Sequence, residues 1–132
     1  MNPSKQKIFI LDDEINFIED TKRLLEEASY TVAGCAKPAE SLRAMKKFQP
    51  DCLILDLRMP LFDGQTFLPW IRRQFPNLAV VVCTGMAEFD KQPLTRLGVR
   101  CYLMKPFTAE VLFDTIDRAI LEQSLSLKQK TA

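Results

Sequence analysis

Short apolar runs alternate along this chain with longer stretches in which apolar residues recur every three or four positions. The short runs predict five buried strands. These strands lie at Lys7–Leu11, Thr31–Ala36, Asp51–Asp56, Ala79–Cys83 and Arg100–Met104. The longer stretches predict five helices, each with one apolar face. These helices lie at Glu14–Ser29, Pro38–Phe48, the residues from Asp63 to Phe75, a short or mobile segment near Lys91–Leu97, and the residues after Thr108.

Prolines and polar residues predict where several of these elements begin or end. Leu57–Phe62 is predicted as a loop, and Asp63 as the N-cap of the helix that follows it. Pro69 predicts either a first-turn position or a kink in that helix, and Pro93 shortens the next one. The last helix is expected to fray at Lys128–Ala132.

The alternation of five strands with five helices predicts an α/β fold whose parallel sheet is covered on both faces. Right-handed crossovers favour a doubly wound five-stranded parallel sheet of order 2-1-3-4-5, the flavodoxin-like (βα)5 arrangement. In such sheets a ligand binds beyond the carboxyl ends of the strands, at the switch point between the first and third strands.

Polar residues suited to phosphoryl chemistry directly follow four of the apolar runs. They are Asp12 and Asp13, Asp56, Thr84, and Lys105. Because parallel strands end at one edge of their sheet, these side chains are expected to gather at one site. Clustered carboxylates repel one another, and Mg²⁺ relieves that repulsion because it prefers oxygen ligands. An aspartate beside such an ion can attack phosphorus, while an ammonium group and a hydroxyl bind the phosphoryl oxygens.

Length and charge narrow the class of protein. With 132 residues, 47% of them hydrophobic and 27% charged, the chain fits one soluble globular domain. A net charge of +1 gives no basic excess for direct nucleic-acid binding. No apolar run approaches a membrane span, and Met1–Lys7 lacks a signal-peptide core. A cytoplasmic location without membrane contact is therefore expected.

Histidine is absent, and the cysteines form no CxxC pair. Without imidazole, the chain cannot run a Ser–His or Cys–His mechanism or carry a phosphohistidine, so any histidine that it depends on must belong to a partner. The four cysteines fall on separate predicted strands, at positions Cys35, Cys52, Cys83 and Cys101. They are interpreted as buried, reduced core thiols, and not as a zinc or redox site.

The site residues and their neighbours match a known family. Over roughly residues 5–123, the chain resembles a response-regulator receiver domain of two-component signal transduction, of the chemotaxis-regulator type. The matching motifs are Asp12–Asp13, Asp56 followed by Met59–Pro60 and Asp63–Gly64, Thr84–Gly85, and Lys105–Pro106–Phe107. Together these motifs are highly specific, although each alone is weak.

The resemblance implies a role for each acidic residue. Asp56 would be the phosphoacceptor. Asp13, Asp56 and the backbone carbonyl of Arg58 would bind Mg²⁺ directly, with Mn²⁺ as an alternative ion. Asp12 would bind the ion mainly through water.

The resemblance also implies a conformational switch. Lys105 would contact the phosphoryl group and join Pro106 through a cis peptide bond. Phosphoryl oxygens would draw the Thr84 hydroxyl inward, and Tyr102 on the fifth strand would then turn from exposed to buried. The surface of the fourth helix, fifth strand and fifth helix would change its partner preference. The same surface is a candidate homodimer interface.

Partners and domain limits follow from the same resemblance. The phosphoryl group would come from a histidine kinase or a histidine phosphotransfer protein, and the signal would pass to an output domain or effector protein. Residues 1–123 are assigned to the receiver domain, and residues 124–132 to a helix extension or the start of a linker or tail. The 12 residues after Ile120 are too few for a DNA-binding domain, so any output is expected outside this chain.

Two other functions remain open at this point. One is a Mg²⁺-dependent phosphatase with an aspartyl nucleophile. Such enzymes usually carry a second acid two residues after the nucleophile, where this chain has Arg58. The other is a receiver-like adaptor that binds its partner without phosphorylation, and the intact acidic site argues against it. As a receiver, the chain would be no metabolic enzyme and would catalyse only its own phosphorylation and dephosphorylation.

Overall fold

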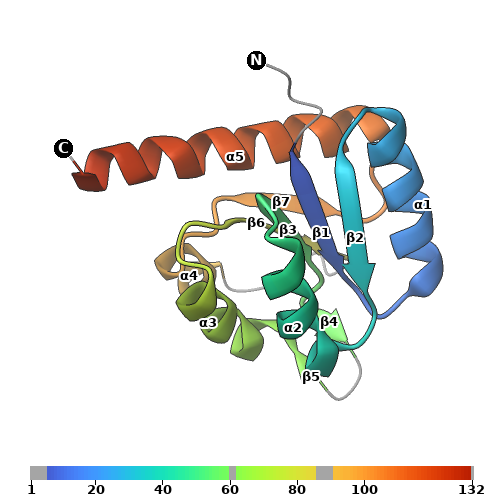
Figure 1. Cartoon of the computed structure of the whole chain (residues 1–132), viewed down its shortest axis with the longest axis horizontal. Coiled ribbons are helices and arrows are strands. Elements are labelled where there is room, and N and C mark those ends of the chain that lie inside the picture. Colours follow the sequence, from blue (N-terminus) through green and yellow to red (C-terminus); the bar gives the residue numbers. More distant parts are fainter. Residues whose placement is uncertain (1–5, 60–61, 86–90, 132) are drawn as a thin grey trace.

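Five parallel strands form the central sheet of the computed structural model, which describes residues 6–59, 62–85 and 91–131. The sheet has the order β2-β1-β3-β6-β7 (Figure 1), and each neighbouring pair is parallel. The strands are β1 (Lys7–Leu11), β2 (Thr31–Cys35), β3 (Cys52–Leu55), β6 (Ala79–Thr84) and β7 (Cys101–Met104). Counted along the chain, these parallel strands have the order 2-1-3-4-5, which confirms the predicted doubly wound topology.

Helices cover both faces of this sheet. Two of them pack on one face and three on the other: α1 (Ile15–Glu27) and α5 (Ala109–Thr131), then α2 (Pro38–Phe48), α3 (Gly64–Gln74) and α4 (Gln92–Arg96). Figure 1 shows α2, α3 and α4 grouped on one side of the strands, with α5 running across the other. Within the described residues, no helix combines the length and the apolarity that crossing a bilayer requires.

The two cores explain why the strands are continuous apolar runs. Along β1, Ile8 and Ile10 belong to the core under α1 and α5, whereas Phe9 and Leu11 belong to the core under α2, α3 and α4. Successive side chains of a strand point to opposite faces, and all four of these residues are at most 1% exposed. A strand buried on both faces has no polar side, so its sequence shows no alternation.

The absence of a side chain at Gly34 lets α1 lie close on β2. A Cβ atom at this position would lie 2.6 Å from Cγ2 of Ile18 and 3.3 Å from the backbone oxygen of Ile10. The first distance is well below the ~3.5–4.0 Å of an ordinary contact between carbon atoms. The glycine therefore sets how closely the first helix approaches the sheet.

The segment between β3 and α3 is not a plain loop. β4 (Arg58–Met59) and β5 (Phe62–Asp63) form an antiparallel pair. The predicted loop Leu57–Phe62 is therefore wrong at the residues that pair, because strands of two residues are too short to produce a hydrophobic period. Asp63 directly precedes α3, but its side chain lies outside the described residues, so its role as an N-cap stays a prediction.

Two prolines with a predicted effect on their helix are Pro69 in α3 and Pro93 in α4. Pro69 lies inside α3, so the first-turn alternative for this residue is wrong. Leu68 and Ile71 beside it are fully buried, and their packing compensates for the backbone hydrogen bond that proline cannot make. Pro93 lies at the start of α4, which has five residues and confirms the predicted short helix.

α5 continues farther than the sequence pattern predicted. It has 23 residues and ends at Thr131, so the expected fraying at Lys128–Ala132 is wrong for residues 128–131, while residue 132 lies outside the described part. Tertiary contacts support the end of the helix: Arg100 donates a hydrogen bond to the Ser126 hydroxyl at 3.2 Å, and Leu127 is half-buried. The helix is unbroken between residues 123 and 124, and the predicted domain boundary there stays a prediction.

Candidate functional site

Four strand ends converge at the carboxyl edge of the sheet. Asp12 follows β1, Asp56 follows β3, Thr84 ends β6, and Lys105 follows β7. Backbone hydrogen bonds connect these ends. The N–H of Asp56 donates to the carbonyl oxygen of Leu11 at 3.0 Å, and the N–H of Lys105 donates to that of Thr84 at 3.0 Å. The sheet thus places side chains from distant parts of the chain next to one another.

Three carboxylates meet at this edge. One oxygen atom each of Asp12, Asp13 and Asp56 lies within 4.8 Å of the other two. Asp12 and Asp56 are buried, and Asp13 is half-buried. Oδ1 of Asp12 accepts a hydrogen bond from the N–H of Glu14 at 2.9 Å. Oδ1 of Asp56 accepts one from the N–H of Arg58 at 3.1 Å, so the main chain orients both buried carboxylates.

The chemistry of this cluster suits a hard divalent cation. Its donors are carboxylate oxygens alone, which are the ligands that Mg²⁺ and Mn²⁺ prefer. Two of the three carboxylates have lost most of their contact with water, which strengthens their mutual repulsion. These residues therefore fit a magnesium or manganese ion.

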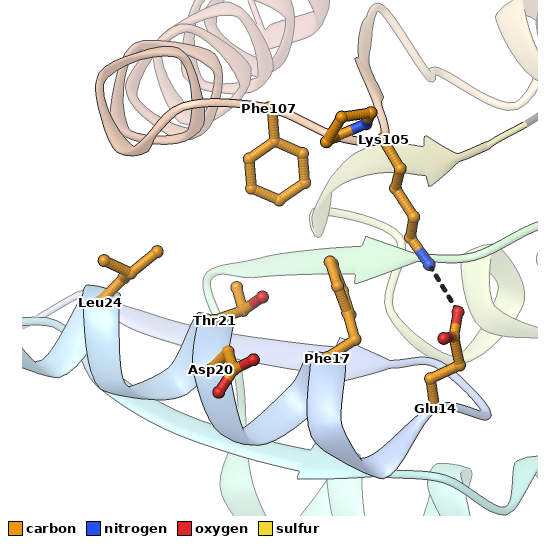
Figure 2. A pocket seen from close by; sticks show the side chains of 8 residues that line it. Glu14, Phe17, Asp20, Thr21, Leu24, Lys105 and Phe107 are labelled. Atoms are coloured by element: carbon orange, nitrogen blue, oxygen red, sulfur yellow. Dashed lines mark ion pairs between the residues drawn. The ribbon is translucent and has the colours of Figure 1, made fainter.

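Lys105 is the counter-ion of the cluster. Its Nζ atom donates to Oδ2 of Asp12 at 2.7 Å and lies 3.6 Å from Oδ2 of Asp56. It also lies 3.7 Å from Oε1 of Glu14, the ion pair drawn in Figure 2. The ring centroid of Phe17 is 4.1 Å from the ammonium nitrogen, a cation–π contact. Lys105 alone does not neutralise the three aspartates.

The pKa values of Asp56 and Lys105 are both raised, but for different reasons. Burial raises the pKa of Asp56, and the charges of Asp12 and Asp13 add to this effect. The hydrogen bond from Arg58 and the charge of Lys105 oppose it without reversing it. Burial lowers the pKa of Lys105, but the hydrogen bond and charge of Asp12, with the charge of Asp56, more than offset this and raise it. Ionisation of Asp56 therefore carries a free-energy cost that Lys105 only partly relieves.

Cys83 and Thr84 are the last two residues of β6, at the carboxyl edge of the sheet. Thr84 is 1% exposed, on the strand that pairs with β3. Burial raises the pKa of the adjacent Cys83 thiol to about 12, although the charge of Lys105 opposes the shift. The thiol stays protonated at neutral pH, and the Thr84 hydroxyl is the group on this strand with the chemistry to bind an oxygen ligand.

Tyr102 lies on β7 apart from the carboxylates. It is half-buried and packs against the core under α2, α3 and α4. Its hydroxyl donates to the backbone oxygen of Val99 at 3.4 Å, and Nζ of Lys91 lies 4.8 Å from its ring centroid. The structure thus brings together Asp12, Asp13, Asp56 and Lys105, while Tyr102 contacts the segment around α4 and its switching role stays a prediction.

A pocket of about 440 Å³ opens beside Lys105. Its walls are α1 and the segment after β7 (Figure 2), with the residues Glu14, Phe17, Asp20, Thr21, Leu24, Lys105, Pro106 and Phe107. The rings of Phe17 and Phe107 meet edge to face, with centroids 6.0 Å apart. The peptide bond between Lys105 and Pro106 is cis, as the resemblance implied.

Sequence reasoning assigned no site role to Glu14 or Phe17. Phe17 was interpreted only as part of the inner face of the first helix, and Glu14 only as its first residue. A usable signal exists, because these residues are three positions apart at the start of the helix that follows Asp12–Asp13. That spacing places them on one helix face beside the acidic pair.

A family model described as "Response regulator receiver domain" matches residues 8–117. The matched region includes all the strand-end residues described above. Both the acidic cluster and its counter-ion therefore fall inside the part of the chain that this family model covers.

Similar proteins and structures are numerous. The DNA-binding transcriptional regulator NtrC of Escherichia coli strain K12 is 31% identical over 114 residues, which are 86% of this chain and 24% of NtrC. A response regulator receiver domain protein from Clostridium thermocellum is 32% identical with a TM-score of 0.81, covering 92% of this chain and 98% of that chain. The receiver domain of NtrC4, solved as a beryllofluoride-activated dimer, is 28% identical with a TM-score of 0.81, covering 90% and 99%. The chain spans about a quarter to a half of the length of the curated relatives that it matches.

Proposed function

This chain belongs to the response regulator receiver domain family, whose members accept phosphoryl groups in two-component signalling, and from that premise we propose that Asp56 is its phosphoacceptor. The observation that carries the proposal is the meeting of three carboxylates with one ammonium group at the carboxyl edge of the sheet. Asp56 is buried and lies near both Asp12 and Lys105, and it occupies the position at which the resemblance to receiver domains expects the acceptor. Its oxygens are the acceptor atoms.

The acidic cluster would hold Mg²⁺, or Mn²⁺ in its place. Asp13 and Asp56 would bind the ion directly, Asp12 mainly through water, and the backbone carbonyl of Arg58 would supply a further oxygen. The hydrogen bond between the Arg58 N–H and Asp56 supports this set, since it keeps the main chain at Arg58 next to the carboxylate. The bound ion would neutralise charge on the carboxylates and on the phosphoryl oxygens.

The transfer would be a substitution at phosphorus. A carboxylate oxygen of Asp56 attacks the phosphorus atom of a phosphohistidine, and a P–O bond forms as the P–N bond breaks. The imidazole leaves with the bonding electron pair, and a proton from solvent neutralises it where needed. Lys105 would bind one phosphoryl oxygen, because its ammonium group is 3.6 Å from Oδ2 of Asp56, and Thr84 would bind another.

The phosphodonor would be a histidine kinase or a histidine phosphotransfer protein, because this chain has no histidine of its own. The pocket between α1 and the segment after β7 supports a docking place beside the acceptor. Phe17, Leu24 and Phe107 give it apolar walls, and Ile15 at the start of α1 is 64% exposed. An amphipathic helix of the donor would lay its apolar face on these residues.

The signal would leave through the surface of α4, β7 and α5. Thr84 and Tyr102 would couple that surface to the phosphoryl group, and the contact between Tyr102 and Lys91 next to α4 supports this route. The same surface would also serve as a homodimer interface. The curated relatives are longer and include transcriptional regulators, which supports an output domain or an effector protein as the next component. We place these events in the cytoplasm.

Labelling with a small phosphodonor tests the acceptor directly. The chain is incubated with acetyl phosphate and Mg²⁺, and its intact mass is measured. We expect the wild type to gain one phosphoryl group, Asp56→Asn to gain none, and EDTA to abolish the gain. Asp114→Asn removes an exposed carboxylate on α5 and is expected to behave like the wild type. Equal labelling of Asp56→Asn and the wild type would refute Asp56 as the acceptor.

The two alternative functions predict different results. A phosphatase would release inorganic phosphate from a phosphomonoester over many turnovers, whereas a receiver takes up one phosphoryl group per chain. A phosphorylation-independent adaptor would show no mass gain at all. We expect stoichiometric labelling without sustained turnover.

A further inference from the structure

A second charged site lies at the opposite edge of the sheet, where the strands begin. It is a pocket of about 240 Å³ between the end of α3, the end of α4, the start of β7 and α5. The residues around it are Arg72, Pro76, Thr95, Arg96, Leu97, Gly98, Arg100, Gln123 and Ser126. Three are arginines and none is acidic. Glu122, which directly precedes Gln123 on α5, does not line the pocket; its Oε2 atom lies 3.9 Å from Sγ of Cys101.

Arg72 supplies a fixed positive charge on the inner wall of this pocket. Its Nε atom donates to the backbone oxygen of Leu97 at 2.8 Å, and Nη1 donates to that of Leu78 at 2.7 Å. Its Nη2 atom is buried and, among the described residues, has no hydrogen-bond partner. A Cβ atom on Gly98 would lie 3.3 Å from Nη2, so glycine at this position leaves room for the guanidinium group. Backbone carbonyls thus hold Arg72 in place, and no carboxylate neutralises it within the part of the chain that the structure describes.

Arg96 and Arg100 are the two exposed arginines that line the pocket. In the described parts of the chain neither forms an ion pair, although Arg100 donates a hydrogen bond to the Ser126 hydroxyl at 3.2 Å. Burial lowers the pKa of Arg72, and the charge of Arg100 lowers it further. The two guanidinium groups therefore repel each other across the pocket, and an anion between them would relieve that repulsion.

We propose that this pocket binds a small oxyanion of the phosphate class, held by Arg96 and Arg100 with Arg72 as a fixed charge behind them. Guanidinium groups bind phosphate oxygens through paired hydrogen bonds. The Ser126 hydroxyl accepts from Arg100, so its own proton stays available to the anion. The volume is below the ~300–1,000 Å³ of pockets for drug-sized ligands, which suits inorganic phosphate or a small phosphomonoester. Ser126 lies in the part of α5 beyond the predicted domain boundary and lines the pocket. The continuation of α5 past residue 123 therefore completes the site.

Calorimetric titration with inorganic phosphate tests the proposal. The full chain is titrated in EDTA at constant ionic strength, so that a metal ion at the acidic edge cannot recruit phosphate. We expect saturable binding by the wild type and at least tenfold weaker binding by the double variant Arg96→Ser, Arg100→Ser. Arg72 is left intact, because its bonds to backbone carbonyls make it part of the fold.

A charge-matched variant separates a local site from a general effect of net charge. Arg43→Ser with Lys47→Ser removes two exposed positive charges from α2 and is expected to bind phosphate as the wild type does. Circular dichroism checks that both double variants are folded. The proposal is overturned if the wild type shows no saturable binding, or if the two double variants bind equally well.

A second arm distinguishes free phosphate from a phosphorylated ligand. Glycerol 3-phosphate that binds at least as tightly as phosphate, and is weakened by the same arginine substitutions, supports a phosphomonoester as the ligand. Weaker binding of glycerol 3-phosphate supports the free ion. Because the acidic edge is untouched, the arginine variants are expected to take label from acetyl phosphate as the wild type does. Phosphate binding at the arginine pocket can therefore be confirmed or refuted independently of the role of Asp56 as phosphoacceptor.

Discussion

Asp56 combines burial with two acidic neighbours, and its chemistry follows from that combination. It is 5% exposed, one of its oxygens accepts the Arg58 N–H, and another lies 3.6 Å from the ammonium group of Lys105. The pKa of Asp56 is nevertheless raised, because burial and the charges of Asp12 and Asp13 outweigh these two favourable contacts. A carboxylate in this position gains from any cation or covalent modification that removes its charge.

Replacing Asp56 with Asn is expected to stabilise the fold in metal-free buffer. The raised folded pKa means that the native state binds a proton more readily than the unfolded chain. The free energy of unfolding therefore falls as pH rises from the unfolded pKa to the folded pKa. Above the folded pKa the wild type carries this whole cost, and the amide carries none at any pH. We expect a gain of about 1 kcal/mol, or about 4 °C in melting temperature.

Melting curves in EDTA at several pH values check this prediction. The advantage of Asp56→Asn is expected to vanish as pH falls through the folded pKa of Asp56, since the wild-type carboxyl is then neutral as well. Asp114→Asn, at an exposed position on α5, serves as the control and is expected to leave stability unchanged. A wild type as stable as Asp56→Asn at pH 7 would contradict the cost assigned to the ionised carboxylate.

The four thiols are expected to differ in reactivity. Cys35 is half-exposed, which corrects the prediction that all four cysteines are buried, whereas Cys52, Cys83 and Cys101 are buried. Burial raises the pKa of the three buried thiols, to about 12 for Cys83. Because the thiolate is the reactive form, iodoacetamide at pH 8 should label Cys35 alone in the folded protein and all four in guanidinium. Labelling of Cys83 as fast as Cys35 in the native state, measured by peptide mass spectrometry, would show this burial to be incorrect.

At the scale of elements, α1 helps to form the surroundings of the acidic cluster. It carries Phe17 to the ammonium group of Lys105, and it forms one wall of the neighbouring pocket. Its place on the sheet depends on Gly34 in β2, which allows Ile18 to approach. A change in this strand therefore acts on the site through the position of the helix.

Gly34→Ala is expected to destabilise the protein by about 1–3 kcal/mol, the usual cost of overpacking a core. The new methyl group would meet Cγ2 of Ile18 and the backbone oxygen of Ile10. Ile18 is β-branched and has few rotamers with which to move aside. Urea denaturation measures the effect, with Gly85→Ala as the matched control, because a Cβ atom at Gly85 meets none of the described residues within 4 Å. Equal losses in both variants would contradict the close approach of α1 to β2.

The whole molecule has opposite charge at the two edges of its sheet. The carboxyl edge carries the acidic cluster, and the amino edge carries the three-arginine pocket. α5 connects them, since it begins shortly after Lys105 and reaches the arginine pocket at Ser126. A cation at one edge and an anion at the other would each stabilise the native state without competing for the same residues.

Mg²⁺ is expected to stabilise the folded chain as a whole. An ion that binds only the native state adds about 1.4 kcal/mol at ten times its dissociation constant, or about 5 °C in melting temperature. Melting curves with increasing MgCl₂, at ionic strength matched with NaCl, measure this. Asp13→Asn removes one carboxylate of the cluster and is expected to shift the response to higher Mg²⁺. A wild type that does not respond to Mg²⁺ would contradict a metal site at this edge.

The amino-acid sequence by itself determined the strands, the sheet order and the edge at which the acidic cluster forms. Buried strands, helix faces and strand-end residues are local signals, and the doubly wound topology carries Asp12, Asp13, Asp56 and Lys105 to one edge. These residues belong to a pattern that can be recognised before any contact is known. The predicted fold is correct for this reason.

Only the tertiary structure decided which partners these residues have. Lys105 binds Asp12 across 93 positions of sequence, and Phe17 meets Phe107 between two elements that no local pattern connects. The length of α5 was mispredicted because its end is stabilised by a contact with Arg100 that the segment itself does not encode. The pairing of β4 with β5 was missed because strands of two residues show no hydrophobic period. The arginine pocket has the same origin, since its charges come from α3, α4 and the start of β7 and meet only when these elements pack.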